Sequence, residues 1–370
     1  MIARDDIIIR KAILHILDTM HGQCILSNTL LDPGPDLYEF IRNHIYKIVV
    51  SDDTKDCEFN PETSPIYPIL TAWDESDEES FIATSQAIAE KLYTSMGEGL
   101  DIPAADLLFV TFQAEGVIYL ALLKMNYKES YTHEISVSDI PAAGFFSDTD
   151  IESDTDVSSG ATSKEEPATT EIRADIVKSR ALLPASGTRI PEAIIINLDD
   201  MHIKLLEKRY EVNGEKVFYL SENFLVCHTS LPPKRKLNIL TKVINTISNK
   251  YDGADLKTKM DTKSALQKEY VDRQSFDVEE IGNRLFGNSP EKKSEFDEKM
   301  EQYDLQFDNF TVTNESTVKK LEKQIMVTDS GIEISIPMET YNKLANLEVQ
   351  TDVTGKTTII IKNIDNLILK

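Results

Sequence analysis

The sequence predicts an α+β fold: an antiparallel sheet of about five strands flanked by helices, followed by a helical segment and a small C-terminal α+β unit. Two observations carry this prediction. Apolar runs joined by short turns occupy the middle of the chain, and amphipathic helical patterns lie before and after them. A chain of 370 residues suggests two domains. We place them at 1–253 and 254–370.

The N-terminal region predicts one strand and two helices. In Asp6–Thr19 the β-branched Ile7–Ile9 favour a strand, whereas the later part fits either a strand or a helix. From Pro35 apolar residues recur at helical spacing, and proline suits the first helical turn. A second amphipathic helix runs from Phe81 to Met96 and is preceded by acidic residues, which favour a helix N-terminus.

Apolar runs in the centre of the chain predict the strands. Leu107–Phe112 and Val117–Met125 are joined by Gln113–Gly116, which is typical of a hairpin. Asn213-Gly214 is a strong hairpin signal, because a type I′ turn requires positive φ at both positions. The remaining runs are Ala193–Leu198, His202–Val212 and Glu215–Leu220.

The C-terminal half is mostly helical by pattern. Pro232-Pro233 begins a long amphipathic helix over Lys234–Tyr251, and Asp252-Gly253 ends it. Asp277–Phe286 predicts a further helix. Another begins at Ser289-Pro290 and is expected to bury Phe296, Met300 and Tyr303. The tail predicts a strand, a short helix and a strand pair: Gly331–Pro337, Met338–Leu344, and Leu347–Asp352 with Thr357–Ile364.

Charge is distributed unevenly along the chain. The net charge is −24, but residues 51–200 hold 9 basic and 30 acidic side chains, whereas residues 201–268 hold 13 basic and 7 acidic ones. A uniformly basic, histone-like protein is therefore excluded. The acidic stretches Asp52–Ser64 and Asp74–Glu79 are expected to be loops. Ser147–Glu171 has eight acidic residues, one lysine and no aromatic residue, so we expect a disordered or loosely packed insertion.

Composition also bears on the compartment and on membrane contact. The longest apolar runs, such as Val117–Leu123, are far shorter than the ~20 residues that a membrane-spanning helix requires. The three cysteines, Cys24, Cys57 and Cys227, form no CxxC pattern, which is simplest to interpret as a reducing cytoplasm. We therefore expect a cytoplasmic protein without a membrane partner.

Three patterns that resemble catalytic or metal sites have weak support. Gly355-Lys356-Thr357 resembles the end of a P-loop, but Gln350 stands where the motif needs glycine, so a hairpin turn is expected. The six histidines lack zinc-site spacing. Asp199, Asp200 and Glu207 near strand ends are similar to nuclease carboxylates, but they lack the usual Glu-x-Lys step. We expect no catalytic residue, metal or cofactor.

A basic helix is the stronger functional signal. Phosphate binding needs several flexible cations on one surface, together with exposed amide groups at a helix start. Arg235, Lys242 and Asn249 are seven residues apart, which places them on one face, opposite the apolar stripe. The alternative is that these side chains only solvate an exposed face. The residues predicted to bind nucleic acid are Lys204, Lys208, Arg209, Lys234, Arg235, Lys236, Lys242 and Lys250.

Long blocks of the chain resemble the NdpA/YejK family of nucleoid-associated proteins, particularly members from low-GC Gram-positive bacteria. These blocks are ADLLFVTF (Ala105–Phe112), YLALLKMNYKESYTH (Tyr119–His133), the segment Glu192–Leu225 and KRKLNILTKVINTISNKY (Lys234–Tyr251). IRKAILHILD near the start and GIEISIP near the end resemble the two ends of that family. The acidic segment around Ser147–Glu171 is the main departure. The resemblance implies a nucleoid protein that binds nucleic acid without enzymatic activity.

The residues and the resemblance together predict a function. We expect low-specificity binding of double-stranded DNA through phosphates, with RNA as a second candidate, in the nucleoid of the cytoplasm. A homodimer would place two basic faces on one duplex, but the sequence leaves the oligomeric state open. One alternative is an acidic adaptor that docks on a DNA-handling enzyme such as a topoisomerase. A cryptic metal-dependent nuclease is the other.

Overall fold

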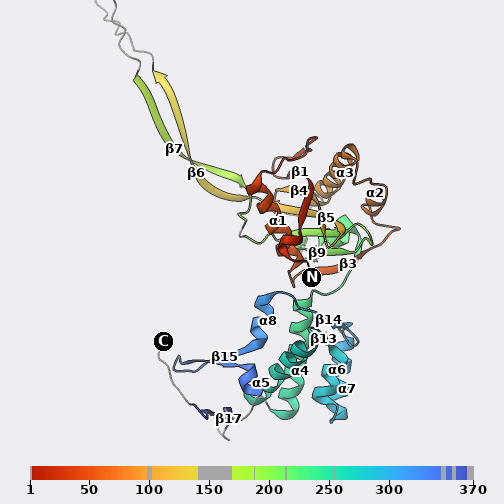
Figure 1. The fold of residues 1–370 in the computed structure, drawn as a ribbon, viewed down its shortest axis with the longest axis vertical. Helices are drawn as coiled ribbons and strands as arrows, with labels where there is room; N and C mark the ends of the chain where they lie inside the picture. Colours follow the sequence, from red (N-terminus) through yellow and green to blue (C-terminus); the bar gives the residue numbers. More distant parts are fainter. Residues whose placement is uncertain are drawn as a thin grey trace, which may run out of the picture.

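A computed structural model describes residues 2–97, 102–140, 169–186, 188–212, 215–253, 256–342, 347–351 and 356–364. It consists of three parts (Figure 1). The sheet body comprises the described residues up to 230, apart from a long two-stranded ribbon that projects away from it. The helical body comprises residues from 233 onward and includes the C-terminal strands. The fold is α+β, as predicted.

The central sheet has eight strands in the order β12-β3-β9-β8-β5-β4-β1-β2, and every neighbouring pair is antiparallel. It is larger than the predicted five strands because three short strands extend its edges. The strands are β1 (Ile8–Asp18), β2 (Gln23–Ile25), β3 (Lys55–Phe59), β4 (Ala105–Ala114), β5 (Val117–Asn126), β8 (Glu192–Asn197), β9 (Ile203–Leu206) and β12 (Cys227–Thr229).

Helices cover both faces of this sheet. Alternate residues of a strand point to opposite faces, so Leu107 and Phe109 join one apolar cluster while Leu108 and Val110 join another. Helix α3 (Glu78–Gly97) and the short helices α2 (Tyr67–Thr71) and η2 (Leu220–Leu225) pack on the first face. Helix α1 (Pro35–Val49) packs on the second, behind the short N-terminal turn η1 (Arg4–Asp6). This double coverage explains the continuous apolar runs of β4 and β5.

Several local predictions in the sheet body are confirmed. β1 continues as one strand through Asp18, which settles the choice between a strand and a helix. Helices α1 and α3 lie where the apolar periodicity places them. The β4–β5 hairpin turns at Glu115 and Gly116, with φ values of 50° and 85°, the left-handed conformation that a two-residue hairpin requires.

Two predictions about short strands are wrong. Asp52–Ser64 is not a loop throughout, because it contains β3, which buries Cys57 and Phe59 between polar neighbours. His202–Val212 is not one strand. It divides into β9, in the central sheet, and β10 (Tyr210–Val212), which pairs with β11 (Glu215–Val217). The break lies at residues 207–209, where the Glu207 side chain turns inward to Lys55 and Ser221.

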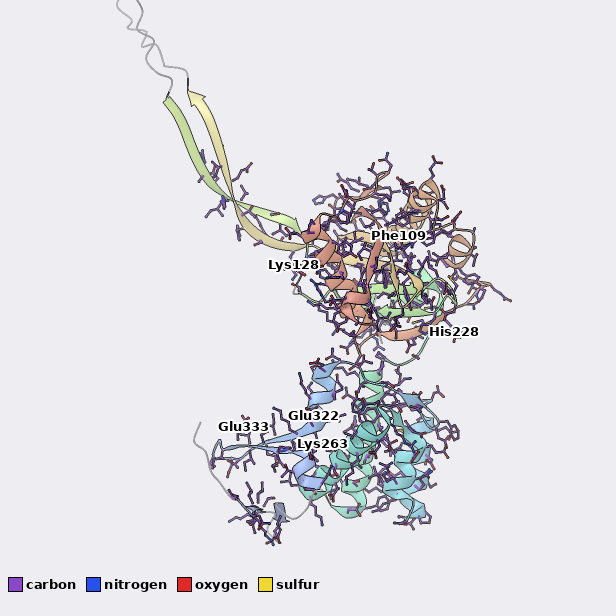
Figure 2. All side chains as sticks on the ribbon, viewed as in Figure 1. Phe109, Lys128, His228, Lys263, Glu322 and Glu333 are labelled. Atoms are coloured by element: carbon purple, nitrogen blue, oxygen red, sulfur yellow. The ribbon has the colours of Figure 1, made fainter. Side chains whose placement is uncertain are left out.

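The ribbon consists of β6 (Lys128–Ile140) and β7 (Thr169–Leu182), which pair antiparallel with each other and extend beyond the sheet body (Figure 1). Lys128 marks the base of the ribbon and Phe109 the interior of the sheet body (Figure 2). The predicted insertion at 147–171 lies largely outside the described residues. Its last three residues belong to β7, so the disorder expected there is contradicted at that end.

The helical body has its own apolar cluster. Helix α4 (Pro233–Asp252) contributes Leu240, Ile244 and Ile247, which pack with apolar residues from the helices and strands that follow. Those elements are α5 (Leu256–Arg273), β13 (Phe276–Asp277), α6 (Val278–Phe286), α7 (Pro290–Glu301), β14 (Asn309–Phe310) and α8 (Glu315–Glu322). Helix α4 therefore packs with the elements that follow it in the chain. The division of the chain into two domains at 253/254 stays a prediction.

Burial in α7 agrees with the prediction at two of three positions. Phe296 and Met300 are buried, whereas Tyr303, just after the helix, is 47% exposed. The tail contains the antiparallel pair β15 (Lys323–Val327) and β16 (Glu333–Pro337), the helix α9 (Met338–Asn342) and the pair β17 (Leu347–Thr351) and β18 (Thr357–Ile361). Gly355 of the P-loop-like tripeptide lies outside the described residues, as does Asn213-Gly214.

A buried carboxylate joins the two bodies. Asp52 is 3% exposed, and its side chain accepts hydrogen bonds from the backbone N–H groups of Thr313 (2.7 Å) and Asn314 (3.1 Å) just before α8. Its carbonyl oxygen accepts from the N–H of Lys234 at the start of α4 (3.1 Å). Asp52 therefore fixes α4 and α8 against the sheet body. Across the described ranges, no helix is long and apolar enough to cross a membrane.

Candidate nucleic-acid interface

Helix α4 presents its cations in two different states. Its apolar face is buried, so the basic residues lie on the remaining sides. Lys234, Lys236 and Lys250 contact carboxylates: their Nζ atoms lie 3.0 Å from Asp53, 2.8 Å from Asp308 and 2.7 Å from Glu295, respectively. These three predicted cations are therefore largely neutralised by acidic side chains from distant parts of the sequence.

Arg235 and Lys242 remain as exposed cations. Both are exposed, and neither has a carboxylate within ion-pair distance among the described residues. Asn238 lies three residues after Arg235 and four before Lys242, and Asn245 lies three after Lys242. Residues at these spacings are neighbours on one side of a helix. The result is a row of alternating cations and amides along α4, which agrees with the face proposed from the sequence.

The three cations predicted on strands lie in the sheet body, but only Lys204 is in a strand, β9. Lys208 and Arg209 lie in the break between β9 and β10. Lys204 Nζ is 3.2 Å from Asp56. Lys208 and Arg209 are exposed, and their charged groups lie over the rings of Tyr210 (5.4 Å) and Phe218 (4.5 Å). Lys204 shares a surface depression with Lys236, but carboxylates also line it, so its charge is mixed. The structure does not join these three residues to the exposed row on α4.

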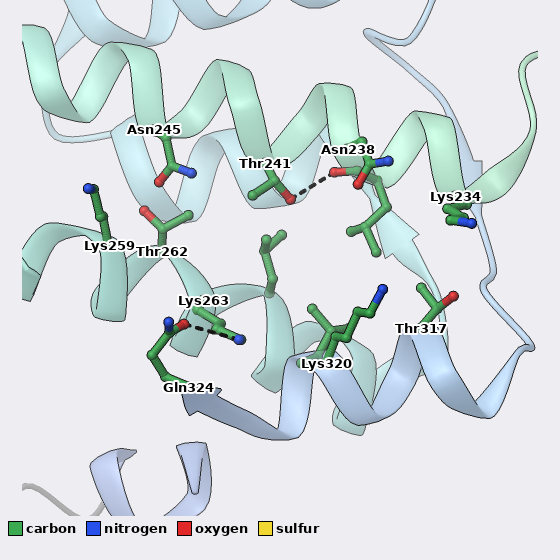
Figure 3. Close-up of a pocket in the computed structure, with 13 residues that line it drawn as sticks. Lys234, Asn238, Thr241, Asn245, Lys259, Thr262, Lys263, Thr317, Lys320 and Gln324 are labelled. Carbon is green, nitrogen blue, oxygen red and sulfur yellow. Dashed lines mark hydrogen bonds between the residues drawn. The ribbon is translucent and has the colours of Figure 1, made fainter. Parts of the chain in front are cut away.

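A cavity of about 340 Å³ lies beside that row, between α4, α5 and α8. We call it the three-helix cavity. Figure 3 shows Asn245, Lys259 and Thr262 at one end and Lys234 and Thr317 at the other. Its lining residues are Lys234, Leu237, Asn238, Thr241 and Asn245 from α4, Lys259, Thr262, Lys263 and Leu266 from α5, and Thr317, Lys320, Leu321 and Gln324 from α8 and β15.

The three-helix cavity is electropositive. Four of its lining residues are lysines, and none of the described lining residues is acidic. Lys259 and Lys320 are exposed and have no carboxylate partner in the described chain. Lys263 is partly buried. Its Nζ donates to two neutral acceptors, the carbonyl oxygen of Lys323 (2.8 Å) and Oε1 of Gln324 (3.1 Å), and Figure 3 shows the second of these bonds.

Lys263 is a partly buried cation whose hydrogen-bond acceptors are neutral. Burial lowers the pKa of its ammonium group, and no carboxylate of the described residues pairs with it to offset that effect. An anion bound in the cavity would favour the charged form. The arrangement can therefore bind negatively charged groups, either in the cavity or across its rim to Arg235 and Lys242.

Part of this site was not predicted from the sequence. Lys259 and Lys263 lie in the basic segment 201–268 and belong to the expected group of phosphate-binding cations, whereas no pattern pointed to Lys320. Lys320 enters the cavity because α8 packs against α5, a contact between segments about 60 residues apart. The pattern ESTVKKLE predicts only an amphipathic helix, so no local signal could have identified this lysine.

The carboxylates considered for a nuclease do not converge. Asp199 and Asp200 are exposed in the β8–β9 turn, whereas Glu207 is engaged with Lys55 (2.6 Å) and Ser221 (2.9 Å). In the part of the chain that the structure describes, no group of three His, Cys, Asp or Glu residues is placed to hold a metal ion.

Comparison with known protein families identifies a match over nearly the whole chain. A family model described as nucleoid-associated protein YejK matches residues 13–368, nearly the whole length. A search of the curated proteins finds no match.

Proposed function

The chain belongs to the family of nucleoid-associated protein YejK, and from this premise we propose that it binds DNA with low sequence specificity, through phosphate contacts and without catalysing a reaction. RNA is a second candidate ligand, because lysine contacts to phosphates do not distinguish the two backbones.

One observation carries this proposal. Seven cations on α4, α5 and α8 have no carboxylate partner among the described residues, although the chain as a whole is strongly acidic. Lys257 and Lys268 of α5 are two of them. The other five line the three-helix cavity or lie beside it on α4, and we call them the basic surface: Arg235, Lys242, Lys259, Lys263 and Lys320. Acidic side chains neutralise the other cations of α4, so on that helix Arg235 and Lys242 are the groups left to meet phosphates.

The chemistry of the basic surface supports low specificity. Four of its five cations are lysines, which act as point charges on flexible stems and suit phosphate oxygens. Reading base edges typically requires planar, bidentate groups such as arginine or asparagine fitted into the major groove. Contacts between lysines and phosphates, in contrast, position a protein on a duplex without selecting a sequence.

A salt series tests the proposal. A short labelled duplex is titrated with the protein and followed by fluorescence anisotropy at several salt concentrations. Neutralising about four to six phosphates predicts a slope of roughly −4 to −5 in log affinity against log salt. Two duplexes of unrelated sequence should give the same slope and similar affinities. A slope near zero, or no binding at low salt, would contradict phosphate-mediated binding.

A second candidate function is suggested by a cluster of acidic side chains at the start of α3. Asp74, Asp77, Glu78 and Glu79 are all exposed on the sheet body. Such a surface suits a basic partner, for example a DNA-handling enzyme such as a topoisomerase. Co-purification of a basic DNA-handling protein at low salt, lost when these four residues are changed to their amides, would support this role. Capture that is unchanged by the substitutions would exclude docking at this cluster.

A further inference from the structure

We propose that the three-helix cavity binds a nucleoside polyphosphate, a small ligand distinct from the nucleic acid of the proposed function. The inference rests on the size, charge and mixed lining of the cavity. It does not require that the protein bind DNA.

The size of the cavity selects a small molecule. Its volume of about 340 Å³ lies at the lower end of the range of ~300–1,000 Å³ typical of small-molecule sites. The paired bases of a duplex are stacked and enclosed by two backbones, so they cannot enter a recess between three helices. A duplex could contact only the rim. The interior is therefore available to a ligand of nucleotide size.

The charge of the cavity selects a polyanion. Lys234, Lys259, Lys263 and Lys320 surround the space, and the Nζ of Lys263 donates to two neutral oxygens. Among these four lysines only Lys234 has a carboxylate partner within the described residues, namely Asp53, which lies outside the lining residues. Several uncompensated ammonium groups around one space repel each other. A ligand with two or more phosphates would relieve that repulsion and accept charge-assisted hydrogen bonds.

The rest of the lining fits a nucleoside rather than phosphate alone. The cavity has an apolar part made by Leu237, Leu266 and Leu321, where the flat face of a base can be buried. The amides of Asn238 and Asn245 provide donors and acceptors suited to the edge of a base or to ribose hydroxyls. Inorganic phosphate would leave these groups unused, so the nucleoside part should add affinity.

Calorimetric titration of the full chain with ATP and with GTP, without magnesium or DNA, tests this site. The test variant is Lys259→Gln/Lys320→Gln. Both side chains are exposed and lack a carboxylate partner in the described structure, so folding should be preserved. The control is Lys319→Gln, which removes a neighbouring lysine of α8 that pairs with Glu315 and does not line the cavity. Inorganic tripolyphosphate is titrated in parallel.

The proposal predicts that at least one nucleotide binds with a dissociation constant below about 100 µM. The double variant should weaken that binding by roughly tenfold or more, as expected for lost hydrogen bonds to charged groups, while the control binds normally. No binding at millimolar nucleotide would overturn the proposal. So would equal affinity for tripolyphosphate, or an equal loss in the control variant.

The outcome is separable from that of the proposed function. If the salt series shows DNA binding but the nucleotide titration shows none, the cavity is only part of the phosphate-binding surface and this inference fails alone. If nucleotide binds and then displaces a labelled duplex, the two ligands share Lys259, Lys263 and Lys320. If nucleotide binds while the duplex never does, the cavity stands and the DNA proposal fails.

Discussion

His15 gives the sheet body a stability that depends on pH. The side chain is fully buried in β1, and burial lowers its pKa from 6.5 to about 4. Nδ1 accepts the backbone N–H of Ser27 (3.1 Å), so the ring proton resides on Nε2, which lies 3.1 Å from Oγ of Ser85. Protonation of Nδ1 would break the bond to Ser27 and place a charge in an apolar core.

The sign follows from proton linkage. Below pH 6.5 the unfolded chain binds a proton at His15, whereas the folded chain does not until the pH approaches 4. The contribution of His15 is therefore complete above pH 6.5 and is lost as the pH falls from 6.5 toward 4. Between pH 7 and pH 5 these two pKa values predict a loss of about 2 kcal/mol in the free energy of unfolding.

Urea denaturation at pH 7 and pH 5 measures this loss, with His15→Gln as the reference. Other groups titrate in both proteins, so the quantity of interest is the difference between their pH dependences. The wild type should lose about 2 kcal/mol more than the variant over this interval. Equal losses in the two proteins would show that His15 is not held neutral by burial.

Two further predictions concern buried charge. Lys124→Met should lower the free energy of unfolding by about 3–5 kcal/mol, because Glu192 loses its buried ion-pair partner at 2.8 Å. Urea denaturation measures this loss, and the double variant Lys124→Met/Glu192→Leu should recover most of it. Asp52→Ala should remove about 3 kcal/mol of coupling between the two bodies, since the N–H groups of Thr313 and Asn314 lose a carboxylate acceptor. In that variant two unfolding transitions should separate. The fluorescence of the single tryptophan, Trp73, reports the unfolding of the sheet body, and circular dichroism reports the loss of helix. Coincident transitions would contradict the role of Asp52.

Sequence periodicity predicted the elements whose burial pattern is local. Helices α1, α3 and α4 and the β4–β5 hairpin were predictable, because each presents its apolar residues at the spacing of its own secondary structure. The strand β3 was missed, since only Cys57 and Phe59 are buried within a short acidic run. The ribbon of β6 and β7 was also missed, because its strands pair across residues 141–168.

The site was only partly predictable for a similar reason. Heptad spacing correctly placed Arg235 and Lys242 on one exposed face of α4. Neutralisation of Lys234, Lys236 and Lys250 depends on Asp53, Asp308 and Glu295, which approach only in the folded chain. The three-helix cavity likewise exists only because α8 returns to α5. Local patterns identified cations, and tertiary contacts determined which of them remain available.

The measurement that tests the basic surface most directly is DNA affinity after charge reversal on α4. Arg235→Glu/Lys242→Glu changes two exposed cations without breaking any ion pair among the described residues. The matched control, Lys91→Glu/Lys128→Glu, makes the same charge change on α3 and β6. We predict that anisotropy titration at low salt shows binding by the wild type and the control, with the α4 variant weakened at least tenfold and its salt slope smaller by about two. Equal affinities for the α4 variant and the control would contradict the account.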